Sequence, residues 1–135
     1  MSDSFGRAPS LDDFAALAEN AFAALPEAFR KMAGEVVFRV QDFADPEVLN
    51  ELGIEDAFEL TGLYQGVDLT QRSVFDPTPQ ASLVFLYRRP ILDEWAEHGE
   101  VTLEELVTHV LVHEIGHHFG LSDAQIEAIE AAAEG

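Results

Sequence analysis

The sequence predicts an α+β fold in which a small sheet of three to four strands packs against one long helix, with further helices on its flanks. Three observations support this fold class. The chain has 135 residues, of which 47% are hydrophobic, so it can form one core. Short runs of β-branched and aromatic residues alternate with segments of helical periodicity. The longest helical segment ends in a cluster of histidines, which makes it the expected carrier of a site.

The N-terminal third is expected to be helical. Residues 1–9 are predicted to form a flexible N-terminus and residues 10–135 a single domain, because no linker or repeat divides the chain. Ser10 precedes two acidic residues and an apolar stripe, a pattern typical of a capped helix start. Pro26 should interrupt this helix, and residues 27–33 should form another helical segment.

The central part of the chain changes to a strand-like pattern. Strands are expected where β-branched and aromatic residues gather, at residues 36–40, 58–66 and 82–88. Short helices should follow the first and third strands, at residues 46–53 and 92–98. Residues 67–80 are rich in turn-forming residues and long enough for a functional loop.

The best-defined helix of the sequence is predicted at residues 102–119. Thr102 and Glu105 form a capping box, and apolar residues follow at helical spacing. Gly120 should end this helix, since glycine adopts a left-handed cap without steric cost. Ser122 should then begin the last helix.

Charge and cysteine content exclude several classes of function. Acidic residues outnumber basic ones by 26 to 7, giving a formal charge of −19, which disfavours binding to nucleic acid or to anionic membranes. No cysteine is present, so any metal must be bound by His, Asp or Glu. The sequence shows no secretion signal and no transmembrane-length apolar run, so we expect a soluble cytoplasmic protein, and we expect it to be a monomer.

The end of the long helix carries the chemistry. It reads HEIGHHFGLSD and contains the H-E-x-x-H pattern, with His113 and His117 four positions apart and Glu114 beside the first. Positions i and i+4 lie on one face of a helix, so both imidazoles can bind one metal ion. Glu114 is close enough to reach a water molecule on that metal without being a ligand itself.

The third ligand is predicted from the turn after the helix. Asp123 would point away if the helix continued, but a left-handed cap at Gly120 lets the chain fold back. Alternatives remain: Glu127 and Glu130 are rival ligands, and Asp123 also fits a first-turn acid of the last helix. Two imidazoles and one carboxylate suit Zn²⁺, which lowers the pKa of bound water toward about 7. Zn²⁺ is therefore the expected cofactor.

Further residues are candidates for contacts with substrate. His118 points about 100° away from His117, so we expect it outside the ligand set. His109 lies one turn before His113 and either lines the cleft or forms a hydrogen bond in a partly buried position. Candidates for gripping substrate or stabilising an oxyanion are Tyr64, Tyr87, Arg88, Arg89 and His118. Each tyrosine also fits a packing role in the core.

The chain resembles the zincin-like metallopeptidases, in particular the small bacterial minimal zincins. The resemblance extends from about Val36 to Asp123 and depends mainly on HEIGHHFGLSD, with LYRRP at residues 86–90 as a weaker motif. The pattern H-E-x-x-H-x-x-G-x-x-D is similar to that of the metzincins, with Asp in place of the third His. The resemblance implies a sheet behind the motif helix, with one strand edge bordering the cleft, and we expect the third strand, at Ser82 to Tyr87, to form that edge.

By this resemblance His113, His117 and Asp123 are the metal ligands and Glu114 is the general base. The predicted function is hydrolysis of peptide or protein substrates by a zinc-dependent metallopeptidase. No methionine follows Asp123, so the methionine turn of the metzincins is missing. Two alternatives therefore stay open: a non-catalytic metal-binding interaction module with a zincin fold, and an Fe²⁺ enzyme that uses the same ligands.

Overall fold

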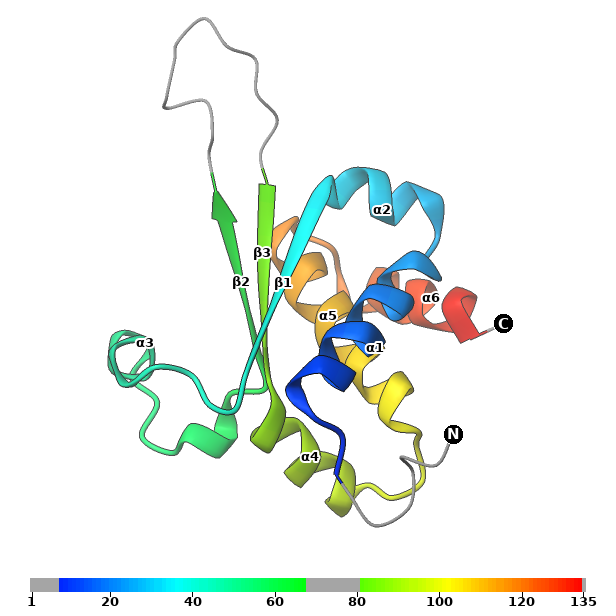
Figure 1. Ribbon diagram of the computed structural model, residues 1–135. Helices are drawn as coiled ribbons and strands as arrows, with labels where there is room; N and C mark the ends of the chain where they lie inside the picture. Colours follow the sequence, from blue (N-terminus) through cyan, green and yellow to red (C-terminus); the bar gives the residue numbers. More distant parts are fainter. Residues whose placement is uncertain (1–7, 68–80, 135) are drawn as a thin grey trace, which may run out of the picture.

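The structure has two layers, a mixed sheet and a group of helices on one of its faces (Figure 1). It is a computed structural model that describes residues 8–67 and 81–134. The α+β fold class predicted from the sequence is confirmed, with a sheet of three strands in the described part of the chain. The predicted flexible N-terminus lies mostly outside the described residues. Residues 68–80 of the predicted functional loop also lie outside them.

Two helices open the described chain. Helix α1 spans Leu11–Ala23 and begins with a capping box, in which Ser10 and Asp13 exchange hydrogen bonds between side chain and backbone. Helix α2 spans Glu27–Ala33, with Pro26 at its N-cap. Both helices agree with the sequence prediction, because caps and proline act locally.

The three strands are β1 (Glu35–Gln41), β2 (Gly62–Val67) and β3 (Ala81–Tyr87), arranged in the order β1-β3-β2. Strand β3 pairs in parallel with β1 and antiparallel with β2, so it is the central strand. The prediction that the third strand forms the edge beside the cleft is therefore wrong. Its nearly continuous apolar sequence fits a strand covered on both sides, and the edge next to α5 is β2.

Three short elements surround the base of the sheet. Helix α3 spans Pro46–Leu52, the 3-10 helix η2 spans Ala57–Glu59, and helix α4 spans Arg88–Glu97. The predicted second strand thus begins later than expected, after η2. Helix α4 begins earlier than expected, because Pro90 lies in its first turn, where a backbone N–H has no helical partner to lose.

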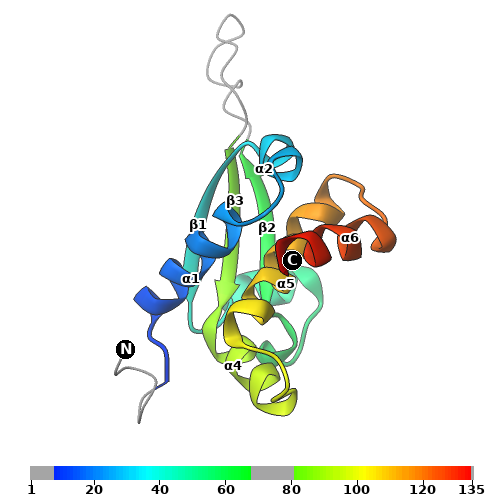
Figure 2. The ribbon, with the colours of Figure 1, turned by 90° about the vertical axis from the view of Figure 1, so that its right-hand side faces the viewer.

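Helices α5 (Leu103–His118) and α6 (Asp123–Glu134) complete the fold. Helix α5 packs against β2, β3 and α1 through its apolar side chains, and α6 lies on the side of α5 that faces away from the sheet (Figure 2). The two helices approach closely at Gly116, where an added Cβ would lie 2.9 Å from Cγ1 of Ile126. Ile126 itself is completely buried.

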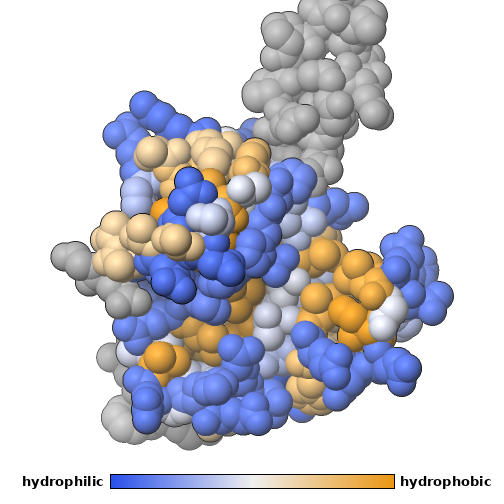
Figure 3. All heavy atoms as spheres, turned by 180° about the vertical axis from the view of Figure 1, so that it is seen from behind, coloured by the Kyte–Doolittle hydropathy of each residue, from blue (hydrophilic) through white to orange (hydrophobic). Residues whose placement is uncertain are grey.

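The face of the molecule shown in Figure 3 is largely hydrophilic, with an apolar patch at the edge that carries α3. Leu52 of α3 and Phe58 of η2 are among its exposed side chains, with exposed fractions of 49% and 43%. The ring of Phe58 packs edge-on against Phe43, 5.0 Å between centroids. No helix in the described ranges is long and apolar enough to cross a membrane.

Candidate metal and active site

The turn after α5 determines where the last helix begins. Gly120 has φ of +78°, the left-handed conformation predicted for it. The N–H of Leu121 donates to the carbonyl of Gly116 at 2.9 Å, which closes a Schellman motif. Ser122 and Gln125 then form a capping box at the start of α6, with hydrogen bonds of 2.8 and 3.2 Å. The predicted end of α5 and start of α6 are confirmed.

This turn brings Asp123 back toward the histidines. Oδ1 of Asp123 lies 3.6 Å from Nε2 of His117. Two ligand atoms that share a tetrahedral zinc ion lie about 3.3 Å apart, because each bond is about 2.0–2.1 Å long. The rings of His113 and His117 follow each other on α5, with centroids 5.4 Å apart. Two imidazoles and a carboxylate are donor types that zinc accepts, and in this set the structure shows the approach of Asp123 to His117.

Glu114 lies between α5 and the sheet. Its side chain is half-buried and covers Gly62 of β2, where an added Cβ would lie 3.4 Å from Cγ of Glu114 and 2.7 Å from Cγ1 of Val110. Glycine at position 62 therefore permits the strand to approach the helix. Burial raises the pKa of Glu114, while His117 and a backbone hydrogen bond from Tyr64 act in the opposite direction.

The outer edge of β2 faces this carboxylate. The N–H of Tyr87 donates to the carbonyl of Thr61 at 3.0 Å, which places position 61 in a hydrogen-bonded pair with β3. Hydrogen-bonded and non-hydrogen-bonded pairs alternate in an antiparallel ladder, so Gly62 and Tyr64 direct their backbone groups away from β3. The hydrogen bond from the Tyr64 backbone to Glu114 agrees with this orientation.

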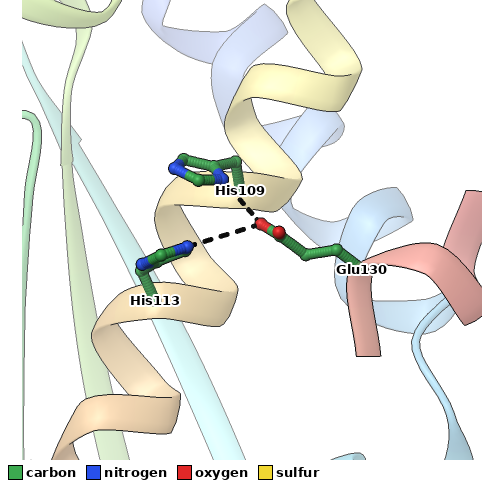
Figure 4. Close-up of side chains that lie close together, drawn as sticks. All are labelled: His109, His113 and Glu130. Carbon is green, nitrogen blue, oxygen red and sulfur yellow. Dashed lines mark hydrogen bonds and ion pairs between the residues drawn. The ribbon is translucent and has the colours of Figure 1, made fainter. Parts of the chain in front are cut away.

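A second group of potential ligands lies one turn earlier on α5. In the described residues, His109, His113 and Glu130 bring one ligand atom each to within 4.8 Å of one another (Figure 4). Nδ1 of His109 lies 2.6 Å from Oε1 of Glu130, and Nε2 of His113 lies 3.7 Å from the same oxygen. Glu130, weighed as a rival third ligand from the sequence, is thus near His113 but on the His109 side.

His113 is shared between the two groups. Burial is the main cause that lowers its pKa, and the neighbouring His109 lowers it further, while Glu130 raises it. A lowered pKa favours the neutral imidazole, which is the form that binds a metal ion.

Tyr64 and His118 contact each other instead of the ligand groups. Their rings stack with centroids 3.9 Å apart. The Tyr64 hydroxyl lies 2.7 Å from Oγ of Ser82, and that oxygen donates to the carbonyl of Ala33 at 3.2 Å. His118 therefore covers β2 from the end of α5, and the Tyr64 hydroxyl is part of a hydrogen-bond chain to the end of α2.

Tyr87, Arg88 and Arg89 are not brought to the histidines. Tyr87 is 1% exposed, and strand alternation directs it to the face opposite Leu86, which lies in the core with α5. The Arg88 guanidinium donates to the carbonyl of Pro9 at 2.6 Å and to Asp42 at 3.0 Å, so it joins distant parts of the chain. Arg89 lies over the ring of Phe43, 6.0 Å from its centroid.

The pairing of His109 with Glu130 is the feature that sequence reasoning missed. A signal was present, because His109 and His113 repeat the four-residue spacing of His113 and His117. The partner could not be identified, since Glu130 is 21 positions away and only the packing of α6 on α5 brings it there.

Comparison with known proteins identifies the family of the chain. A family model described as zincin-like metallopeptidase matches residues 33–133. This range includes all three strands and the whole of α5 with its histidines. No curated protein matches the chain closely enough to add a relative of known activity.

Proposed function

The chain belongs to the zincin-like metallopeptidase family, and from that premise we propose that it is a zinc-dependent peptidase. The metal ligands in this proposal are His113, His117 and Asp123. The observation that carries the proposal is the turn at Gly120, since it returns Oδ1 of Asp123 to 3.6 Å from Nε2 of His117. Glu114 lies beside these ligands and faces the outer edge of a strand.

Each residue has a separate task in this reaction. The ligands hold zinc, which supplies a Lewis acid that polarises a carbonyl and makes water more acidic. Glu114 accepts a proton at its carboxylate and delivers it to the amine that leaves when the peptide bond breaks. Partial burial raises the pKa of Glu114, which makes it a better proton acceptor than an exposed carboxylate.

The substrate in this proposal is a peptide in extended form. Gly62 and Tyr64 direct backbone groups away from β3, to the outer edge of the sheet that the structure describes, where the Tyr64 backbone donates to Glu114. An extended peptide can pair with such an edge as an additional strand, and its backbone then lies along the site. Peptide binding of this kind depends on main-chain hydrogen bonds, so we expect it to tolerate many side chains.

The test is cleavage of a diverse peptide library by the zinc-loaded protein. We expect hydrolysis that a chelator abolishes and that Glu114→Gln lowers by about 10²–10⁴-fold, the usual contribution of a general base. Glu104→Gln is the matched control, because Glu104 is an exposed glutamate in the first turn of the same helix. It should leave hydrolysis unchanged.

The same experiment separates the alternative functions. A non-catalytic metal-binding module would bind zinc as tightly as the enzyme, yet wild type and Glu114→Gln would be equally inactive across the library. An Fe²⁺ enzyme would contain iron after purification without added metal, and elemental analysis would detect it. Either result would refute the zinc peptidase.

A further inference from the structure

Helix α5 carries a ladder of three histidines, at positions 109, 113 and 117. The four-residue spacing places all three imidazoles along one side of the helix. The centroids of the His109 and His113 rings are 4.0 Å apart, and those of His113 and His117 are 5.4 Å apart. The ladder therefore contains two overlapping pairs, each with the spacing of a two-histidine metal site.

Helix α6 supplies one carboxylate to each pair. Asp123, at its start, approaches His117, and Glu130, about two turns later, approaches His109 and His113. We call His113, His117 and Asp123 the downstream set and His109, His113 and Glu130 the upstream set. Figure 4 shows the members of the upstream set converging from the two helices.

We propose that the upstream set is a second divalent-cation site, which competes with the downstream set for His113, so that one chain holds its cation in one set or the other. The distances of 2.6 and 3.7 Å from Oε1 of Glu130 to the two imidazoles fall on either side of the separation of about 3.3 Å between ligands of one zinc ion. A cation bound there would take the place of the hydrogen bond between His109 and Glu130.

Burial and charge support a cation at this place. The Glu130 side chain is 18% exposed, and a carboxylate so far removed from water needs a positive or hydrogen-bonding partner. His109 and Glu130 also line a groove of about 1100 Å³ whose wall includes Glu94, Glu97 and Glu104. The negative potential of such a groove raises the local concentration of cations.

The two sets differ in what surrounds them. Glu114 follows the shared His113 and faces β2, whereas the residue after His109 is Val110, whose side chain packs against Gly62. The upstream set therefore has no glutamate in the place that Glu114 takes beside the downstream set, and we expect a chain that holds its cation there to be inactive. This regulatory consequence rests on the proposed peptidase function, but the binding of the cation does not.

The test is titration of the metal-free full-length protein with Co²⁺, followed by the visible absorption of the bound ion. One variant, His117→Gln with Asp123→Asn, disables the downstream set. Its matched counterpart, His109→Gln with Glu130→Gln, disables the upstream set. A third variant combines all four substitutions, and circular dichroism verifies that each is folded.

We expect wild type and both single-set variants to bind one Co²⁺ per chain. The combined variant should bind it more than about 100-fold more weakly, since the loss of mere outer-shell partners already costs 10–100-fold. His113→Gln should weaken binding similarly, because both sets need this residue.

Two results would overturn the proposal. If the downstream-disabled variant binds Co²⁺ no more tightly than the combined variant, His109 and Glu130 form only a hydrogen bond between helices. If wild type binds two tight Co²⁺ ions, the sets do not compete for His113. Neither result depends on hydrolysis, so a failure of the peptidase proposal, seen as equal inactivity of wild type and Glu114→Gln, remains distinguishable.

Discussion

The two histidine pairs of α5 have the same spacing but different surroundings. His113 and His117 lie near the end of the helix, beside Glu114, the edge of β2 and the turn at Gly120. His109 and His113 lie one turn earlier, where the helix faces α6 and an acidic groove. Ligand spacing is thus a property of the helix alone, whereas the chemistry available to a bound metal depends on what packs beside it.

The comparison also explains why β2 matters more to the site than the long central strand. Strand β3 contributes buried side chains such as Val84 and Leu86, which belong to the same core cluster as the apolar side chains of α5. Strand β2 contributes backbone groups at its free edge and a glycine under Glu114. Glu114, the candidate base beside the downstream pair, contacts this strand, so changes in β2 should distinguish the two pairs.

The largest effect in this comparison is expected for Gly62→Ala. The new Cβ would lie 2.7 Å from Cγ1 of Val110 and 3.2 Å from the carbonyl oxygen of Phe85, so either the Val110 side chain or strand β2 must shift. Overpacking of this kind typically costs about 1–3 kcal/mol. Chemical denaturation should show the loss of stability, and peptide hydrolysis should fall by more than Co²⁺ affinity, because β2 contacts Glu114, the candidate base.

Gly99→Ala is the matched control for this prediction, since no atom lies within 4 Å of the Cβ it would add. It should leave stability and hydrolysis near the wild-type values. Equal effects of the two substitutions would show that the approach of β2 to α5 has no special role at the site.

A smaller effect is expected for Gly120→Ala, which changes the turn that positions Asp123. A side chain in the left-handed region costs about 1–2 kcal/mol, and Gly120 has φ of +78°. Gly53→Ala is the control, because Gly53 has φ of +72° at the end of α3 and, like Gly120, open space around its Cβ position. Both variants should lose similar stability in thermal unfolding.

Only Gly120→Ala should also weaken Co²⁺ binding by the downstream set, measured in the His109→Gln, Glu130→Gln background. If both glycine variants bind Co²⁺ equally well in that background, the turn at Gly120 is not what positions Asp123.

The smallest effect concerns the titration of Tyr87. Burial, Asp45 and Glu114, in that order, raise its pKa to about 12 from 10.0. The folded state holds the phenol proton more tightly than the unfolded state does. The free energy of unfolding therefore includes the full contribution of Tyr87 below pH 10 and loses it as the pH rises from 10.0 toward 12. Tyr87→Phe should remove this part of the alkaline loss of stability.

The pKa of Tyr87 should also respond differently to substitution of Glu114 and of Glu130. Glu114→Gln should lower the pKa of Tyr87 slightly in the metal-free protein, measured by tyrosinate absorbance. Glu130→Gln should leave it unchanged, since Glu130 is not among the causes of the shift. If both variants change the pKa of Tyr87 by the same amount, Glu114 has no special electrostatic effect on Tyr87.

Much of the candidate site could be predicted from local sequence. His113, Glu114 and His117 share one helix, and their relative positions follow from its geometry. The return of the chain at Gly120 could also be predicted, because a left-handed cap is a local conformation for which glycine is suited. Arg88 was a candidate for substrate binding, but its contacts to Pro9 and Asp42 come from segments far away in the sequence.

Local sequence thus specifies most of the helices, their caps and the placement of the histidines on one helix face, since these features depend on hydrogen bonds between near neighbours. The central position of β3 and the edge position of β2 could be seen only in the tertiary structure, because strand order depends on pairing between distant segments. The tertiary structure also decided that Glu130 meets His109 and His113, through the close packing of Ile126 on Gly116. Contacts of this kind depend on the relative placement of whole elements, which no local pattern specifies.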